Sequence, residues 1–137
     1  MGILAYFKRK LYERRKKRLA LTFPLYCKAH GVKTPNRQGA LAQSDAGDRL
    51  QLVHSPLPEF PHNVYIYNVE LNRVIGYLHK TVAEKLVALF GKGFCRDGEI
   101  EQVTGGGEYK YRGCNLKVFE SMEMLKEQWK DVRYLKE

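Results

Sequence analysis

The middle of the chain carries the pattern that most limits its possible folds. Residues 63–69 (Asn-Val-Tyr-Ile-Tyr-Asn-Val) are mostly β-branched and aromatic, which favours a strand. Leu71-Asn72 is typical of a turn, and residues 73–78 (Arg-Val-Ile-Gly-Tyr-Leu) supply a second strand. Gly76 inside this second strand indicates a bulge or a close approach of another backbone segment. The pattern therefore predicts an antiparallel hairpin at the centre of the fold.

Weaker patterns on both sides of the hairpin extend the sheet. Alternating residues predict a strand over 49–53, and three prolines within residues 56–61 predict an extended surface loop, because proline interrupts helices. Residues 81–84 (Thr-Val-Ala-Glu) have the form of a capping box and predict a helix that ends at Gly91. Further strands are expected over residues 98–103, 109–112 and 114–119, with glycines 105–107 as a hairpin loop and a last helix that begins at Ser121.

This order of elements predicts an α+β, mainly β fold: a small, OB-like, partly open barrel of short antiparallel strands with one inserted helix. With 137 residues, the chain has the length of one ordinary domain and can bury a core without disulfides. We expect a basic N-terminal helical arm over residues 1–22, an irregular linker over 23–47 and a globular domain over 48–137 that includes a C-terminal helix. A short strand near Leu25–Lys28 is the alternative within the linker. The side chains expected in the core are Val64, Ile66, Ile75, Leu86, Leu89, Val118 and Trp129.

The net charge of +9 is concentrated in the arm. Residues 8–18 contain eight Lys and Arg side chains against Glu13, which amounts to +7 and leaves +2 for the rest of the chain. Such a run can neutralise nucleic-acid phosphates and release their counterions. The candidate phosphate contacts are Arg14, Arg15, Lys16, Lys17 and Arg18.

Two other interpretations of the arm stay open. Helical spacing places Leu4, Phe7 and Leu11 on one face, so the arm can also lie on an anionic membrane surface or dock on an acidic protein. The third interpretation is a solvated helix end without a partner. The apolar residues of the arm precede its charges, which is the reverse of a secretory signal. No apolar run approaches the ~20 residues that a membrane-spanning helix needs.

The sequence contains no recognisable catalytic motif. Neither Gly-x-Ser-x-Gly nor Ser-x-x-Lys occurs, and glycines 105–107 are not followed by the Gly-Lys-Ser/Thr of a phosphate-binding loop. Cys27, Cys95 and Cys114 form no Cys-x-x-Cys pair, so we expect no zinc site, no disulfides and a reducing, cytoplasmic setting. The sequence therefore predicts a protein that is not an enzyme and that needs no metal or cofactor.

Tyrosines and cations alternate along the predicted strands. Tyr65 and Tyr67 are two residues apart, as are Tyr109 and Tyr111, so each pair shares one face of its strand. Such a face can stack bases while cations follow the phosphates. The alternative is that these tyrosines are ordinary half-buried strand residues. The cations near them in the sequence are Arg73, Lys80, Lys110 and Arg112.

Residues 50–119 resemble a HIRAN domain. The pattern of that family has an Asn-Pro-Tyr-Asp segment, a hairpin that contains Ile-Gly-Tyr-Leu, and a following helix rich in Ala and Leu. Residues 75–78 (Ile-Gly-Tyr-Leu) and the helix after them match this pattern, and residues 58–67 stand at the place of the first motif. Phe60 replaces the Tyr of that motif, and Pro61 replaces its Asp.

The resemblance implies an OB-like barrel that binds single-stranded DNA, in some members at a free 3′ end. Carried over to this chain, it implies Phe60, Tyr77 and Lys80 as groove contacts and Asn63 as a residue that fixes the loop. Without the motif's Asp, stacking and backbone contacts are the interactions expected to remain. The hairpin topology also brings Phe60 close to Tyr77 and Lys80, so we expect these three on one exposed surface. The alternative is that both rings plug the barrel.

Together these patterns predict a non-enzymatic module that binds nucleic acid. Single-stranded DNA or a DNA end is the favoured partner, within a larger DNA-processing complex. The alternative function is that of a protein-interaction or membrane-surface adaptor that uses the basic N-terminal helix.

Overall fold

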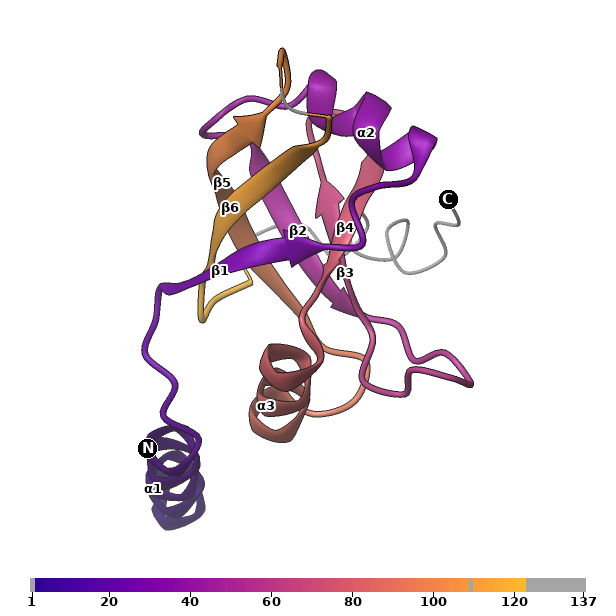
Figure 1. The fold of residues 1–137 in the computed structure, drawn as a ribbon. Helices are drawn as coiled ribbons and strands as arrows, with labels where there is room; N and C mark the ends of the chain where they lie inside the picture. The colour runs from indigo at the N-terminus through magenta and orange to yellow at the C-terminus, as the bar shows by residue number, and fades with distance from the viewer. Residues whose placement is uncertain (1, 109, 123–137) are drawn as a thin grey trace.

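The computed structural model describes residues 2–108 and 110–122. In this part of the chain, six antiparallel strands close into a barrel in the order β1-β4-β3-β2-β5-β6 (Figure 1). The strands are β1 (Leu25–His30), β2 (Arg49–His54), β3 (Val64–Asn68), β4 (Arg73–Leu78), β5 (Cys95–Gly105) and β6 (Arg112–Val118). The helices are α1 (Ile3–Arg18), α2 (Pro35–Ala42) and α3 (Lys80–Phe90).

The predicted α+β, mainly β fold class is confirmed, and the central hairpin forms from β3 and β4. The barrel is closed rather than partly open, because β1 pairs with strands on both of its sides. Ala29 lies opposite Leu78 of β4, and Leu25 lies opposite Val118 of β6. The first strand of the chain thus closes the barrel between two strands that come much later in the sequence.

The prediction of an irregular linker over residues 23–47 is wrong, because this segment supplies both β1 and α2. The alternative of a short strand near Leu25–Lys28 is confirmed by β1, which continues to His30. Pro35 stands in the first turn of α2, and the hydroxyl of Thr34 caps that turn by accepting a backbone hydrogen bond. Gln38 then ties α2 to β6, since its side chain exchanges hydrogen bonds with the backbone of Arg112 at 2.9 Å in each direction. The segment is therefore an integral part of the barrel, and α2 covers one end of it (Figure 1).

Helix α3 packs against the other end of the barrel with a different cap from the one predicted. His79 is the capping residue, and its ring Nδ1 accepts a hydrogen bond from the backbone of Thr81 at 3.2 Å. The expected capping box from Thr81 to Glu84 does not form. Gly91 ends the helix as predicted, with a φ of 92° that favours glycine.

The core predicted from the strand and helix faces is confirmed for the residues that the structure describes. Leu21 is also buried, with 6% of its surface exposed, so the globular part begins inside the predicted arm and not at residue 48 as predicted. Trp129 and the predicted C-terminal helix lie outside the described residues. The predicted core residues found buried are Val64, Ile66, Ile75, Leu86, Leu89 and Val118.

Candidate nucleic-acid-binding pocket

A pocket of about 600 Å³ opens among the loop that joins β2 to β3, the end of β4 and the first turns of α3. The four residues that the HIRAN resemblance implied all line it, although they come from three different segments of the chain. The complete lining is His30, Arg37, Leu57, Glu59, Phe60, Pro61, His62, Asn63, Tyr65, Tyr77, Leu78, His79, Lys80, Ala83 and Glu84.

A row of three aromatic side chains runs across the sheet at the base of the pocket. Tyr77 on β4 lies directly opposite Tyr65 on β3 and directly opposite His30 on β1. Side chains paired in this way have Cβ atoms about 4.5–5.5 Å apart. The next residue, Gly31, has a φ of 64°, and a Cβ at this position would overlap the ring of Tyr77. Gly31 therefore leaves the space in which the ring lies, and Tyr77 keeps 38% of its surface exposed.

Phe60 is presented by a loop that hydrogen bonds hold in one shape. Its backbone exchanges hydrogen bonds with Leu57 at 3.0 and 3.1 Å, which closes a tight turn. The amide of Asn63 donates to the carbonyl of Ser55 at 3.0 Å, the role that the resemblance implied for it. The ring of His54 donates to the carbonyl of Pro61 at 2.9 Å. This fixed loop leaves 62% of Phe60 exposed, so neither Phe60 nor Tyr77 plugs the barrel.

Lys80 and His62 share the Glu84 carboxylate at the pocket, and Arg37, with 7% of its surface exposed, lies buried beside Tyr77. The side chain of Lys80 is 81% exposed, and its ammonium lies 3.9 Å from the Glu84 carboxylate. His62 Nδ1 lies 3.9 Å from the same carboxylate. The guanidinium carbon of Arg37 lies 5.6 Å from the centre of the Tyr77 ring, and Arg37 also donates to the carbonyl of Gly31 at 2.6 Å. An exposed ring can stack a base, and a cation beside the ring can bind the phosphate of the same strand.

His30 adds a titratable ring at the edge of the aromatic row. Its ring centre lies 5.1 Å from that of His79. Partial burial is the main cause that lowers the pKa of His30, and the neighbouring His79 and Lys28 lower it further. A lowered pKa keeps the His30 ring neutral at pH 7, which suits a ring that stacks.

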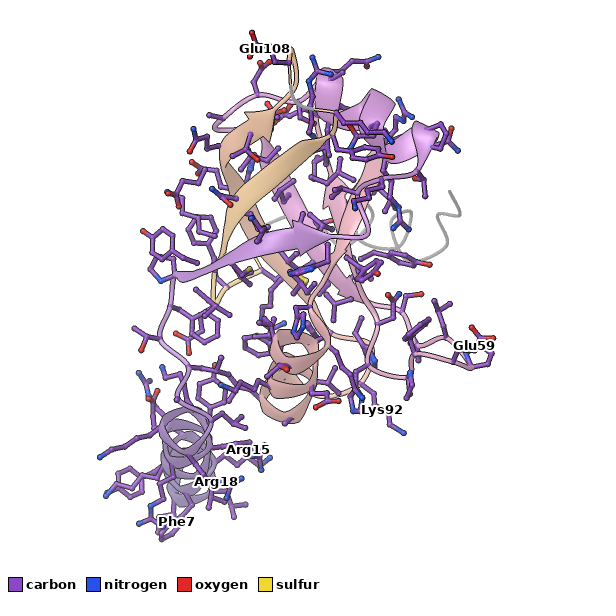
Figure 2. The ribbon with its side chains drawn as sticks, in the orientation of Figure 1. Phe7, Arg15, Arg18, Glu59, Lys92 and Glu108 are labelled. Carbon is purple, nitrogen blue, oxygen red and sulfur yellow. The ribbon has the colours of Figure 1, made fainter. Side chains whose placement is uncertain are left out.

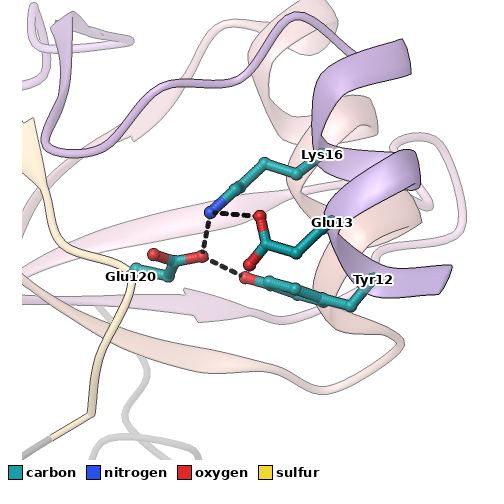
Figure 3. A network of polar contacts seen from close by, with 4 residues as sticks. All are labelled: Tyr12, Glu13, Lys16 and Glu120. Carbon is teal, nitrogen blue, oxygen red and sulfur yellow. Dashed lines mark hydrogen bonds and ion pairs between the residues drawn. The ribbon is translucent and has the colours of Figure 1, made fainter. Parts of the chain in front are cut away.

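The arm is fastened to the barrel by one polar network (Figure 3). The Glu120 carboxylate accepts hydrogen bonds from the Tyr12 hydroxyl at 2.6 Å and from the Lys16 ammonium at 2.9 Å. Lys16 also lies 3.3 Å from Glu13. The hydrogen bond from Tyr12 is the main cause that lowers the pKa of Glu120, followed by the contact with Lys16. Lys16 therefore anchors the arm, and with its side chain 22% exposed it is less accessible than the other predicted arm contacts.

The other four predicted arm contacts are exposed on α1. Figure 2 shows Arg15 and Arg18 on the arm and Glu59 on the pocket loop, well separated on the two sides of α3. The structure therefore brings together the pocket residues but leaves the arm as a second, separate basic surface. Its four exposed cations are Arg14, Arg15, Lys17 and Arg18.

The apolar residues of the arm are also exposed rather than packed on the barrel. Leu4 is 77% exposed, Phe7 55% and Leu11 56%. Among the described residues, no helix combines the length and the hydrophobicity needed to cross a bilayer. In the same residues, no group of three or more His, Cys, Asp or Glu side chains is placed to hold a metal ion.

The expected pair of Tyr65 and Tyr67 does not form an exposed face. Tyr67 is 2% exposed and packs with Val53 and Val74 on the outer side of the barrel wall, so it is not available for stacking. Tyr109 lies outside the described residues. Sequence reasoning also missed His30 and Arg37, because both fall in the segment expected to be a linker. The apolar residues Leu25, Cys27 and Ala29 recur at every second position, which was the sequence signal for a strand that continues to His30.

Comparisons of the chain with family models, with curated proteins and with solved structures find no match. Its function is therefore argued from the pocket and the arm themselves.

Proposed function

We propose that the protein is a non-enzymatic module that binds single-stranded nucleic acid, preferably DNA, in the pocket between the β2–β3 loop and α3. The observation that carries this proposal is the convergence of Phe60, Tyr77 and Lys80 on one exposed pocket. The resemblance of residues 50–119 to a HIRAN domain supports it, since the same residues are those that the resemblance implies. DNA processing within a larger complex in the cytoplasm is the setting that we propose for this activity.

The chemistry of the pocket suits an unpaired strand better than a duplex. The faces of Phe60 and Tyr77 can accept bases only where the bases are unpaired, and each stack stabilises a complex by about 1–3 kcal/mol. Lys80 can then turn from Glu84 to a phosphate, because an exposed ion pair of this kind contributes less than about 1 kcal/mol. The four exposed cations of the arm add attraction that does not depend on sequence and that weakens with salt.

The test is a titration of labelled single-stranded, duplex and recessed-end oligonucleotides, in DNA and RNA forms, at two salt concentrations. We expect the single strands to bind most tightly. Tyr77→Ala should weaken single-strand binding by about 5- to 140-fold, because one base loses the ring on which it stacks. Tyr77→Phe keeps the ring and should bind like the parent protein. Tyr111→Ala is the control, because Tyr111 is a similarly exposed ring, 37% accessible, and it does not line the pocket. A folded Tyr77→Ala variant with unchanged affinity would show that the pocket is not the binding site.

Docking of the arm on an anionic membrane is a second candidate, which the exposure of Leu4, Phe7 and Leu11 favours. Apolar side chains beside a basic run gain free energy from insertion among lipid headgroups, whereas nucleic acid makes no use of them. Co-sedimentation with vesicles that contain or lack phosphatidylserine tests this candidate. Binding that needs the anionic lipid and is lost in Phe7→Ser, but kept in Tyr111→Ala, would support the membrane-surface role.

A further inference from the structure

The outward face of β1 runs from the pocket to the chain segment that leads to the arm. The side chains of Leu25, Cys27 and Ala29 pack against the barrel core. Because successive strand residues point to opposite faces, Tyr26, Lys28 and His30 form a row on the outside. Tyr26 is 63% exposed, and Lys28 is exposed as well.

We propose that a single strand held in the pocket continues along this row, over His30, Lys28 and Tyr26, towards the basic arm. The inference rests on the proposed function and extends it, because it names the path of the strand outside the pocket. It makes the pocket and the arm two ends of one binding surface.

The row meets the pocket at His30. This residue lines the pocket and is the direct cross-strand partner of Tyr77. His30 therefore belongs both to the aromatic side chains at the base of the pocket and to the row along β1. A strand with one base on Tyr77 therefore has a second ring, that of His30, beside it for another base.

The other end of the row points to the arm. Figure 1 shows β1 crossing the barrel, with its first residues next to the chain that descends to α1. Only six residues, 19–24, separate the end of α1 at Arg18 from Leu25. Across β6, Tyr26 lies opposite Lys117, whose ammonium lies 3.7 Å from the Glu99 carboxylate. The positive charge along this path therefore comes from Lys28 and the arm.

The spacing and chemistry of the row suit a single strand. Alternate residues of a strand lie about 6.4–6.8 Å apart, so the row from Tyr26 to His30 spans about 13 Å. A cation between two rings allows a base to stack on each ring while the ammonium of Lys28 meets a phosphate of the strand between them. OB-type barrels bind about 4–16 nucleotides.

The test compares a tetranucleotide with a 16-nucleotide single-stranded DNA of the same base on the full chain. We expect Tyr26→Ala to weaken binding of the 16-mer by about 5- to 140-fold and to leave the tetranucleotide unchanged, because only the longer strand reaches Tyr26. Lys28→Ala should reduce the slope of log affinity against log salt for the 16-mer by about 0.7. Tyr26→Phe should bind like the parent protein.

Matched controls come from the far end of the barrel. Tyr111 is an exposed ring with the ammonium groups of Lys33 and Lys110 each 5.3 Å from its centre, so it copies the chemistry of the row at another place. Tyr111→Ala and Lys33→Ala should leave both oligonucleotides unaffected. The path along β1 is overturned if a folded Tyr26→Ala variant binds the 16-mer normally, or if the controls weaken it equally.

These outcomes separate the two proposals. If Tyr77→Ala weakens both oligonucleotides and the substitutions on β1 weaken neither, the pocket stands and the path along β1 fails. If neither oligonucleotide binds the parent protein, both proposals fail.

Discussion

The ammonium of Lys16 lies 2.9 Å from the carboxylate of Glu120, and this contact joins the N-terminal arm to the segment that follows β6. Tyr12 stands one helical turn before Lys16 and donates to the same carboxylate at 2.6 Å. Two side chains on one face of α1 therefore share one acceptor on the barrel (Figure 3). The network leaves the neighbouring cations of the arm pointing elsewhere and exposed.

Acid should release the arm from the barrel. The pKa of Glu120 is lowered by the hydrogen bond from Tyr12 and then by Lys16. A lowered pKa means that the network is fully stabilising above the ordinary Glu value of about 4.3 and is lost as the pH falls through the lowered pKa. An NMR titration from pH 6 downwards should show the Tyr12 and Lys16 signals moving together.

The matching variant is Glu120→Gln, which keeps the shape of the side chain and removes its charge. It should loosen the arm at neutral pH, with faster amide exchange in α1, and should abolish the acid transition. The change in stability should stay below about 1 kcal/mol, because the two charged groups are partly exposed. Unchanged exchange in α1 would mean that apolar contacts of residues 19–23 hold the arm by themselves.

The salt dependence of binding should come largely from four residues of the arm. Replacing Arg14, Arg15, Lys17 and Arg18 with Gln should reduce the slope of log affinity against log salt by up to about 3 on single strands. Substitution is a cleaner test than deletion of residues 1–22, because Leu21 belongs to the core. Lys33→Gln with Lys110→Gln is the control for lost charge alone. An unchanged slope in the arm variant would remove the arm from nucleic-acid binding.

The sequence predicts best those elements whose pattern is local. The hairpin of β3 and β4 was predictable because its strand residues and its turn are adjacent in the chain. A short strand near Leu25–Lys28 was also predictable, but its role in closing the barrel was not, since that role depends on Val118 and Leu78, which lie far away in the sequence. The polar residues Lys28 and His30, which carry no strong strand preference, obscured its end. The place of such a strand in a barrel can be recognised only when its distant partners are known.

The same distinction holds for the candidate site. Phe60, Tyr77 and Lys80 flank one hairpin, so their convergence could be predicted from topology and is confirmed. Arg37 reaches the pocket only because α2 packs on the barrel, and the sequence does not reveal that packing. The burial of Tyr67 was missed for a related reason, because alternation identifies the face of a strand but not what covers that face.

Truncation of the core side of α3 should destabilise the whole barrel. Leu86 has none of its surface exposed and belongs to the main core cluster, so Leu86→Ala removes a buried side chain and leaves a cavity. The expected loss of unfolding free energy is about 2–5 kcal/mol, measured by urea denaturation. Lys85→Ala, one residue away on the same helix, is the control and should change stability by less than about 0.5 kcal/mol. A loss below about 1 kcal/mol for Leu86→Ala would mean that the site collapses freely around the missing atoms.

Adding one methyl group at Gly31 should disable the pocket without removing any of its side chains. Gly31 has a φ of 64°, and a Cβ there would overlap the ring of Tyr77, so Gly31→Ala must displace that ring. Gly47 is a matched control, because it has a φ of 91° and nothing within 4 Å of an added Cβ. Both substitutions should cost about 1–2 kcal/mol of stability from backbone strain. Only Gly31→Ala should also weaken single-strand binding, and the loss should not exceed the loss of about 5- to 140-fold expected for Tyr77→Ala. Equal affinities of the two folded variants would show that the position of the Tyr77 ring does not control binding, because backbone strain is common to both and ring displacement is not.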